Sequence, residues 1–441
     1  MAGLKSGLKN SLNQIREISS EIYTRYVPII DDDTNIATLA EPILTIPVVQ
    51  NEFLNHLINK IVYTKLMVKN FKNPLKFLEG DAIPVGYAGE EIYTNPIGGR
   101  QFNVNDFAGL LQRYEADVKV QYTVVNSDLQ YPVSIERHKL KQAFTSWENL
   151  ESFIDSITTA LYNGAYIDEY RFTKMLVPTA YMNNAVRVEV IANPDTDTKA
   201  KTFTKVARNL FLNFQSPSSN YNGWALVGGY GKPITTWTSP EDIVFIIRND
   251  VRVNLDVDVL ANAFNMDKTT LLGNIVTVDN FDVYNTETGA KVFDGSKIFG
   301  IIADKAWFRI KTQDMYMDEF YNANNRVWNY YLNVTKMYQY SLFANAVVFA
   351  SEAPNYPITN LSFNTSDIDI HVNDYEGLEI EATPVNGTTE VKFSSDNANI
   401  KVEKIDNRNV KVTGVTEGDS VLTAKAGNVS TTLNVHVKPA L

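Results

Sequence analysis

The chain has 441 residues, of which 44% are hydrophobic and 21% charged, so it can bury a core and form about three folding units. It contains no cysteine, which excludes disulfide frameworks, thiolate zinc sites and cysteine nucleophiles. The net charge of −11 disfavours free nucleic acid as a direct partner, since phosphate binding needs clustered Lys and Arg. The sequence shows neither a signal peptide nor a run of about 20 apolar residues, so we expect a soluble protein made in the cytoplasm without membrane contact.

The N-terminal residues predict an amphipathic helix of about 25 residues. Apolar side chains recur there every three or four positions: Leu4, Leu8, Leu12, Ile15, Ile18 and Ile22. Such a helix either packs on its own domain or lies on a neighbouring subunit, and the sequence leaves both open. The acidic run at residues 31–33 is interpreted as a solvated loop.

Residues 72–117 are rich in Pro and Gly, which break helices and favour turns. We predict an extended excursion here, followed by a strand in which Val118, Val120 and Tyr122 alternate with polar residues. Because a bare loop of this length is uncommon in a compact domain, the excursion is interpreted as a functional or contact element.

The body after the excursion shows helix and strand patterns. Thr145 and Glu148 have capping-box spacing ahead of an apolar stripe, so a helix is predicted from Thr145. Further expected elements are a strand at 186–194, a helix at 203–214, a buried strand at 243–250 and a strand passing into a helix at 255–266. Aromatic residues at 328–343 are either core or subunit contact.

The C-terminal region has a different pattern. After a Pro-containing linker at residues 351–357, short alternating apolar runs are separated by turn signals such as Asn386-Gly387. Several short strands at this spacing predict an all-β sandwich over residues 356–441.

No active site is indicated by the sequence. The four histidines are scattered: His56, His138, His371 and His436. The glycines of residues 226–234 do not fit a phosphate loop, because Leu226 and Pro233 replace required residues. Asp256 and Asp258 would share a strand face, but Asp258 is better placed as a helix cap. We therefore predict no catalytic, cofactor-binding or metal-binding residue, and a protein that is not an enzyme.

Several segments resemble the major capsid proteins of phi-29-like small podoviruses, in the same order along the chain. They are PLKFLEGDAIPVGYAGEEIYT (74–94), AFTSWENLESFIDSITTALYN (143–163), LDVDVLANAFNM (255–266), DKAWF (304–308), and VWNYY with FANAVVF (327–349). The segment from VKFSSD to NVHV (391–437) resembles a bacterial group 2 immunoglobulin-like domain, with Phe393 where many members have Trp.

The resemblance implies an α+β shell fold of the Hong Kong 97 type, followed by an all-β immunoglobulin-like sandwich. Its parts would be an N-terminal arm (1–50), a capsid shell domain (51–355), an extended loop (about 72–117), a spine helix (about 145–165), an axial domain (about 180–325) and the sandwich (356–441). Residues 326–350 would return to the peripheral domain.

The implied function is self-assembly of hexamers and pentamers into the icosahedral head shell of a tailed bacteriophage. The implied partners are a scaffolding protein and a portal protein, with a head fibre protein as a further candidate. The shell would assemble in the host cytoplasm and enclose double-stranded DNA without sequence-specific binding, and no cofactor is implied. On the excursion, the candidate subunit-contact residues are Glu90, Glu91, Tyr93 and Arg100.

Two other classes of protein remain as alternatives. One is a phage tail, fibre or surface adhesion protein with an immunoglobulin-like binding domain. The other is an enzyme with a carbohydrate-binding β-module. Repeats or a secretion signal would favour the first, and a catalytic constellation would favour the second, but the sequence displays none of these.

Overall fold

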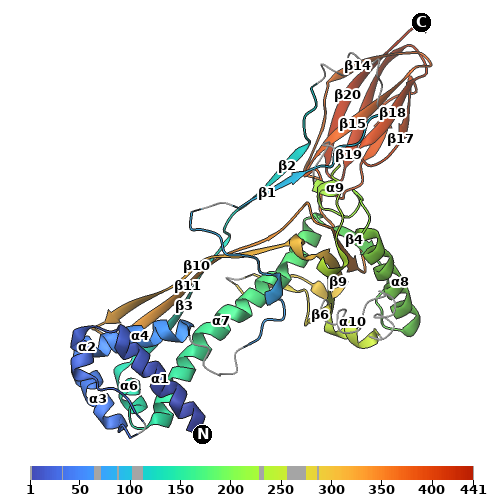
Figure 1. Cartoon of the computed structure of the whole chain (residues 1–441). Coiled ribbons are helices and arrows are strands. Elements are labelled where there is room, and N and C mark those ends of the chain that lie inside the picture. Colours follow the sequence, from blue (N-terminus) through green and yellow to red (C-terminus); the bar gives the residue numbers. More distant parts are fainter. Residues whose placement is uncertain are drawn as a thin grey trace. The chain divides into compact units, whose positions relative to one another are not determined.

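The computed structural model describes residues 2–31, 33–63, 71–86, 89–101, 113–227, 233–255, 275–285 and 288–440. The chain divides into two compact units, and their elements are labelled in Figure 1. The first unit comprises Met1–Gly89, Thr123–Thr173 and Ile310–Tyr338; the second comprises Glu90–Tyr122, Lys174–Arg309 and Gln339–Leu441.

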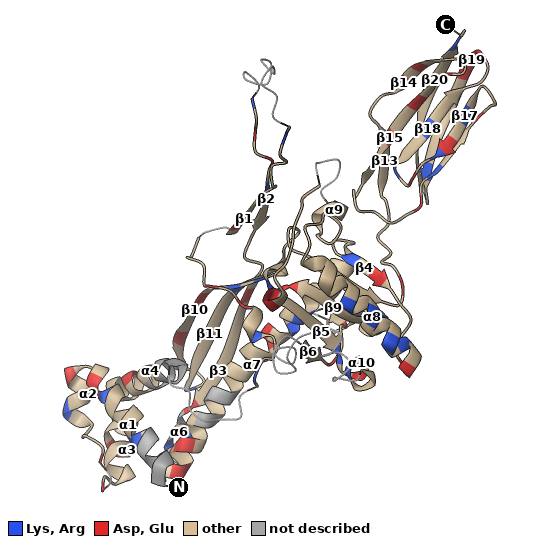
Figure 2. Ribbon diagram, turned by 45° about the vertical axis from the view of Figure 1, so that its right-hand side comes forward, with Lys and Arg blue, Asp and Glu red and all other residues tan. Residues whose placement is uncertain are grey.

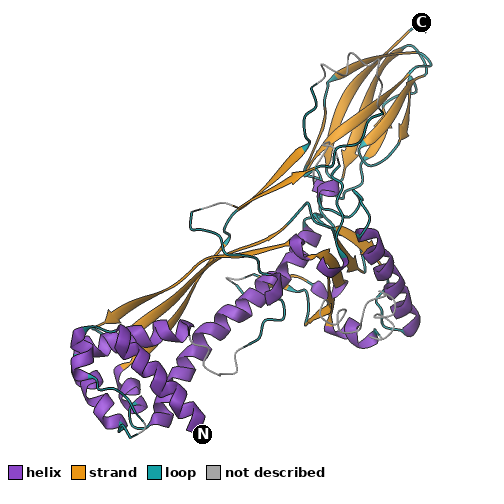
Figure 3. Ribbon diagram, in the orientation of Figure 1, coloured by secondary structure: helices purple, strands orange, loops and turns teal. Residues whose placement is uncertain are grey.

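Helices dominate the start of the first unit (Figure 3). They are α1 (Ala2–Ile18), α2 (Glu21–Tyr26), α3 (Ile36–Thr45), α4 (Pro47–Tyr63) and α6 (Arg137–Ala143). Leu8, Leu12 and Ile15 of α1 are buried in the same core as Phe53 of α4. The described part of residues 1–50, expected as an arm, therefore forms helices that pack on their own unit through Leu8, Leu12 and Ile15, whereas Ile18 at the end of α1 is exposed.

The long helix α7 (Trp147–Met182) has 36 residues, far more than the expected 145–165. Its first turn is capped by Ser146, whose hydroxyl accepts a hydrogen bond from the Asn149 amide at 3.1 Å. The predicted cap Thr145 instead donates to the Gln142 carbonyl at 2.7 Å. The capping residue thus lies one position later than the spacing indicated.

A three-stranded sheet completes the first unit, in the order β10-β11-β3. Its strands are β3 (Ser127–Glu136), β10 (Phe308–Asn322) and β11 (Val327–Tyr340). Strands β11 and β3 are antiparallel, with Trp328 opposite Ile135. Trp328, Tyr330 and Leu332 are buried against the helices, so this part of the aromatic cluster is core.

The second unit contains a five-stranded sheet in the order β4-β12-β9-β5-β6. Its strands are β4 (Arg187–Val190), β5 (Ile243–Arg248), β6 (Ile275–Val278), β9 (Ile298–Asp304) and β12 (Ala346–Ala350). Strand β12 is parallel to β4 and antiparallel to β9. Helix α8 (Asp197–Phe214) packs Phe203 on Phe349 of β12, with ring centroids 4.8 Å apart.

Shorter elements complete this part of the chain. They are α9 (Trp224–Val227), α10 (Asn249–Asn254), β7 (Val283–Tyr284), β8 (Lys291–Phe293) and the 3-10 turns Pro240–Asp242, Gly295–Lys297 and Lys305–Trp307; one more 3-10 turn, Lys76–Leu78, lies in the first unit. The helix and strand expected at 255–266, the carboxylates Asp256 and Asp258, and glycines 228, 229 and 231 lie outside the described residues.

The residues expected to form the axial domain, 180–325, are divided between the two units at residue 309. Most of β10, up to residue 322, belongs to the three-stranded sheet, whereas β12 belongs to the five-stranded sheet. Residues 326–350, expected to return together to the peripheral domain, supply strands to two different sheets: β11 to the three-stranded sheet and β12 to the five-stranded sheet.

The C-terminal residues form a β-sandwich of two four-stranded sheets, ordered β13-β15-β18-β17 and β14-β20-β19-β16. The strands are β13 (Asn360–Phe363), β14 (Asp367–His371), β15 (Tyr375–Thr383), β16 (Lys392–Ser395), β17 (Ile400–Lys404), β18 (Asn409–Gly414), β19 (Gly418–Ala426) and β20 (Val429–Lys438). Its apolar core is drawn from residues 358–437. The predicted sandwich is confirmed; β13 was not predicted. None of the described helices is long and apolar enough to cross a membrane.

Candidate functional site

Strand β1 (Gly89–Thr94) lies in the predicted excursion and pairs with β2 (Val118–Thr123), the strand expected after it, to form a two-stranded ribbon that is visible in Figure 1. Successive side chains of a strand point to opposite faces, so each face carries every second residue. We call the face with Glu91, Tyr93 and Gln121 the inner face, and the face with Ile92 and Tyr122 the outer face.

The inner face is polar, and its side chains form hydrogen bonds with other segments of the same chain. Gln121 donates to the Tyr340 carbonyl at 2.9 Å, and its side-chain oxygen accepts from the Leu342 amide at 2.8 Å. The Tyr93 hydroxyl donates to the Thr235 carbonyl, and burial raises the pKa of Tyr93.

A carboxylate also lies on the inner face. Glu91 accepts hydrogen bonds from Arg309 and from the Ser341 hydroxyl, the latter at 2.8 Å. Its side chain is largely buried, and a charge-assisted contact of this kind fixes geometry better than a neutral one. These bonds hold the ribbon in one orientation on the second unit.

The outer face is apolar and exposed. Ile92 and Tyr122 are 60% and 67% exposed, and Val118 and Val120 of the same face are also exposed. A ribbon that folded only to bury its own apolar surface would have the opposite arrangement. The outer face is therefore a surface suited to contact with another molecule.

The four predicted contact residues divide between the two faces and the loop beyond. Glu90 is exposed beside Ile92 on the outer face. Arg100 is exposed on the loop, where its guanidinium lies over the Tyr114 ring, 5.5 Å from the centroid. Glu91 and Tyr93 lie on the inner face. The outer face was not predicted, although the alternation of Val118, Val120 and Tyr122 with polar residues is a signal for it in the sequence.

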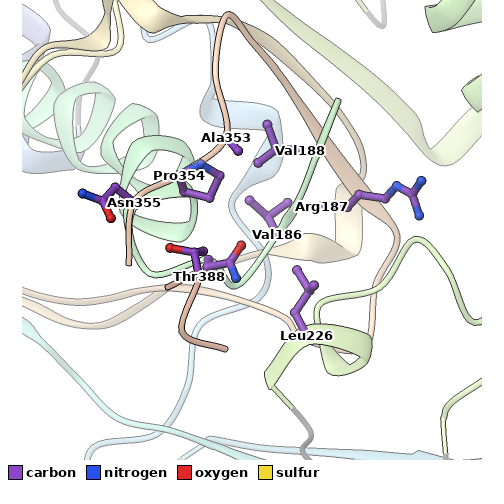
Figure 4. A pocket seen from close by; sticks show the side chains of 9 residues that line it. Val186, Arg187, Val188, Leu226, Ala353, Pro354, Asn355 and Thr388 are labelled. Carbon is purple, nitrogen blue, oxygen red and sulfur yellow. The ribbon is translucent and has the colours of Figure 1, made fainter. Parts of the chain in front are cut away.

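The described structure also contains an open cavity of about 560 Å³ beside β4 and the 351–357 linker (Figure 4). Val186, Val188 and Leu226 supply apolar lining, and Arg187 is the charged residue among those that line it. The lining has no carboxylate or imidazole, so it lacks the groups that general acid–base chemistry requires.

The histidines form no common site. His56 lies 3.7 Å from Glu52, His138 lies 3.0 Å from Glu136, and His436 lies 2.6 Å from Asp419, while the His371 ring lies 2.7 Å from the Pro439 carbonyl. Within the described residues, no group of three or more His, Asp or Glu side chains is arranged to hold a metal ion.

Solved phage structures have a similar fold. The capsid structure of Staphylococcus phage Andhra matches with a TM-score of 0.53 at 16% identity, covering 66% of this chain and 87% of that chain. A structure of the head fibre and inner core protein gp22 of bacteriophage P68 matches with a TM-score of 0.50 at 13% identity, with coverages of 66% and 87%. The mixed helix-and-sheet body therefore has the shell fold of the Hong Kong 97 type, which defines its class.

Sequence comparison gives the family. The family described as Phi29-like phage major capsid protein matches residues 12–350. The major capsid proteins of Bacillus phages B103 and PZA are each 33% identical over 344 residues, covering 77% of this chain and 72% of theirs. The chain belongs to the Phi29-like phage major capsid protein family, and it is a structural protein of the phage head shell. The adhesion alternative is not favoured.

Proposed function

We propose that the chain assembles as hexamers and pentamers into an icosahedral head shell that encloses double-stranded DNA. A scaffolding protein guides this assembly, a portal protein occupies one vertex, and a head fibre protein is a further candidate partner. The family supports the shell, and the exposed apolar outer face of the ribbon is the observation that carries the contact between copies.

In this proposal the outer face docks on a neighbouring copy of the chain. Ile92 and Tyr122 supply apolar area at the centre, where interfaces exclude water. Glu90 and Arg100 lie outside this centre and set register and partner choice more than affinity. Glu91 and Tyr93 act indirectly, since their bonds within the chain hold the ribbon in place.

The proposal includes no catalytic activity. The cavity beside β4 has no acid or base in its lining, and the four histidines each contact a different group and share no site. A reaction would need a nucleophile, base or metal held together in one cleft. The family likewise supports a purely structural role.

Electron microscopy of the purified chain with scaffolding protein tests the contact. Ile92→Asp combined with Tyr122→Asp should abolish closed shells, because both carboxylates would be desolvated in the interface. Ile405→Asp, at an exposed apolar residue of the sandwich, is the matched control and should keep wild-type shell yield. Shells at wild-type yield from the ribbon variant would refute the contact.

Two further variants separate the charged residues. Glu90→Lys should lower shell yield in a salt-dependent manner, because it reverses a charge at the rim of the contact. Glu91→Gln should also lower shell yield, but this loss should depend less on salt concentration, since the variant weakens a largely buried bond to Arg309. Monodisperse monomers from the wild type under every condition would contradict the shell proposal itself.

Deletion of residues 356–441 tests the task of the sandwich. Shells that become fragile after the deletion would assign it as a clamp between subunits. Shells of unchanged stability would assign it as a surface module. The family match ends at residue 350 and does not include the sandwich, which supports testing the sandwich separately from the shell body.

A further inference from the structure

Helix α8 has two faces of very different chemistry. Its buried face consists of Ala200, Phe203, Thr204, Ala207, Leu210, Phe211 and Phe214. Phe203 lies against Phe245 and Phe349 of the five-stranded sheet, with centroid distances of 5.9 and 4.8 Å. This packing fixes the rotation of the helix about its axis, so the opposite face must point away from the sheet.

The opposite face carries a line of basic side chains, which we call the α8 basic stripe: Lys201, Lys205 and Arg208. Their spacing of four and three residues places them on one side of a helix, and they span about 10 Å at 1.5 Å per residue. All three are exposed. Figure 2 shows Lys and Arg gathered along α8.

The stripe is not neutralised within the described part of the chain. Lys199, on another side of the helix, pairs with Asp195 at 2.8 Å. No described carboxylate forms an ion pair with Lys201, Lys205 or Arg208. One acid, Asp197, lies near the stripe in the first turn, where it complements the positive end of the helix dipole. A chain of net charge −11 thus presents a locally basic surface.

We propose that the α8 basic stripe binds the phosphate backbone of the enclosed double-stranded DNA. The inference rests on the proposed enclosure of DNA by the shell, and it places this face of α8 toward the genome. Duplex DNA presents one negative charge about every 1.7 Å along its axis, so three cations within about 10 Å can each meet a phosphate on release of counterions. Such contacts carry no sequence information.

The other residues of this face favour a nucleic acid over an acidic protein. Thr198, Thr202 and Asn209 flank the stripe, and hydroxyl and amide side chains are common contacts to phosphate and sugar. The core of a protein interface is instead depleted in Lys and centred on large apolar or aromatic anchors. Leu212 is the large apolar side chain on this face, and it lies at the C-terminal end of the stripe.

The test measures binding of the full-length protein to a short fluorescent DNA duplex by anisotropy, between about 50 and 200 mM salt. The stripe variant is Lys201→Gln, Lys205→Gln and Arg208→Gln. The control is Lys141→Gln, Lys392→Gln and Lys425→Gln, which removes the same charge from exposed positions elsewhere. Circular dichroism verifies that both variants fold.

We expect the stripe variant to bind DNA more than about tenfold more weakly than the wild type. Its plot of log affinity against log salt concentration should be shallower by roughly 2.7, because each of the three lost phosphate contacts removes about 0.9 from the slope. The control should keep wild-type affinity and slope. Equal losses in both variants, or no binding by the wild type, would overturn the proposal. Stripe-dependent binding of polyglutamate as tight as that of DNA would overturn it in favour of an acidic protein.

Electron microscopy with scaffolding protein separates this inference from the shell proposal. The stripe variant should still form shells, because Lys201, Lys205 and Arg208 are not among the ribbon residues proposed to join the subunits. A stripe variant that forms shells and binds DNA like the wild type refutes the stripe alone. A wild type that never forms shells refutes the proposed function instead.

Discussion

The ammonium group of Lys336 lies 2.6 Å from a carboxylate oxygen of Glu169, and both side chains are more than nine-tenths buried. Lys336 comes from β11 and Glu169 from α7, and the pair lies within the first unit. Glu79 lies 3.1 Å from the same ammonium, and Lys76 lies 3.0 Å from Glu169. The four charges cancel, which makes the burial of Lys336, Glu169 and Glu79 tolerable, while Lys76 stays half exposed.

Removing one member of this cluster should be strongly destabilising. Lys336→Met leaves Glu169 and Glu79 with too little compensation in a buried site, and we expect a loss of about 3–5 kcal/mol in the free energy of unfolding. Denaturant unfolding measures it. Lys139→Met, at an exposed lysine paired with Glu136, should cost about 0–1 kcal/mol. Adding Glu169→Leu to Lys336→Met should recover part of the loss; a further loss of similar size would contradict the charge argument.

The same cluster predicts sensitivity to acid. Burial alone would raise the pKa of Glu79, but hydrogen bonds from Lys76 and Thr312 and the charge of Lys336 outweigh it, so the pKa lies below its usual value. A lowered pKa in the folded state gives stability that is present above the unfolded pKa, about 4.3, and is lost as the pH falls through the folded value. Unfolding followed from pH 7 downward should show this loss beginning near that unfolded pKa.

Glu79→Gln is the matched variant for this prediction, because the amide cannot titrate. Its stability should be lower than that of the wild type at neutral pH and should vary less between neutral and acid pH. Equal acid sensitivity of the two proteins would place the responsible carboxylate elsewhere.

The second unit should depend on the aromatic contact beneath α8. Phe203→Ala removes a ring that is 1% exposed and packed on Phe349, so we expect a loss of about 3–5 kcal/mol. Hydrogen exchange of the β12 amides reports this locally, since a chain of two units need not unfold in one step. Leu212→Ala, on the exposed side of the same helix, should change protection little. Unchanged protection of β12 in the Phe203 variant would contradict the packing described.

Local patterns were sufficient to predict several elements. The apolar spacing of Phe203, Val206, Leu210 and Phe214 predicted α8. The apolar run within residues 243–250 predicted a buried strand, of which residues 243–248 form β5 and are nearly all buried. Helix α8 buries one apolar face and β5 is buried on both, and each arrangement leaves a distinct local pattern in the sequence. The strand spacing after residue 355 likewise predicted the sandwich, because short-range turns set that spacing.

Contacts between distant residues were not predictable in this way. Lys336 and Glu169 are 167 residues apart, and no local pattern indicates that they meet. Strand β12 pairs with β4 and β9, so the sheet assignment of residues 346–350 depends on topology. At the candidate site, Glu91 and Glu90 are adjacent acids, and only the orientation of the ribbon separates their roles.

The β-sandwich carries a titratable pair, His436 and Asp419, whose contribution to stability should fall as the pH rises, opposite to that of Glu79. His436 on β20 lies 2.6 Å from Asp419 on β19, and Asp369 is its cross-strand neighbour on β14. The hydrogen bond to Asp419, followed by the charges of Asp419, Asp369 and Asp367, raises the pKa of His436 above 6.5. A raised pKa gives stability that is complete below the unfolded pKa and is lost as the pH rises through the folded value.

Thermal unfolding of the sandwich should therefore shift to lower temperature as the pH rises from about 6 to 8. Asp419→Asn should reduce this shift, while His138→Gln in the first unit should leave it unchanged. A shift that survives both Asp419→Asn and His436→Gln would show that other groups cause it.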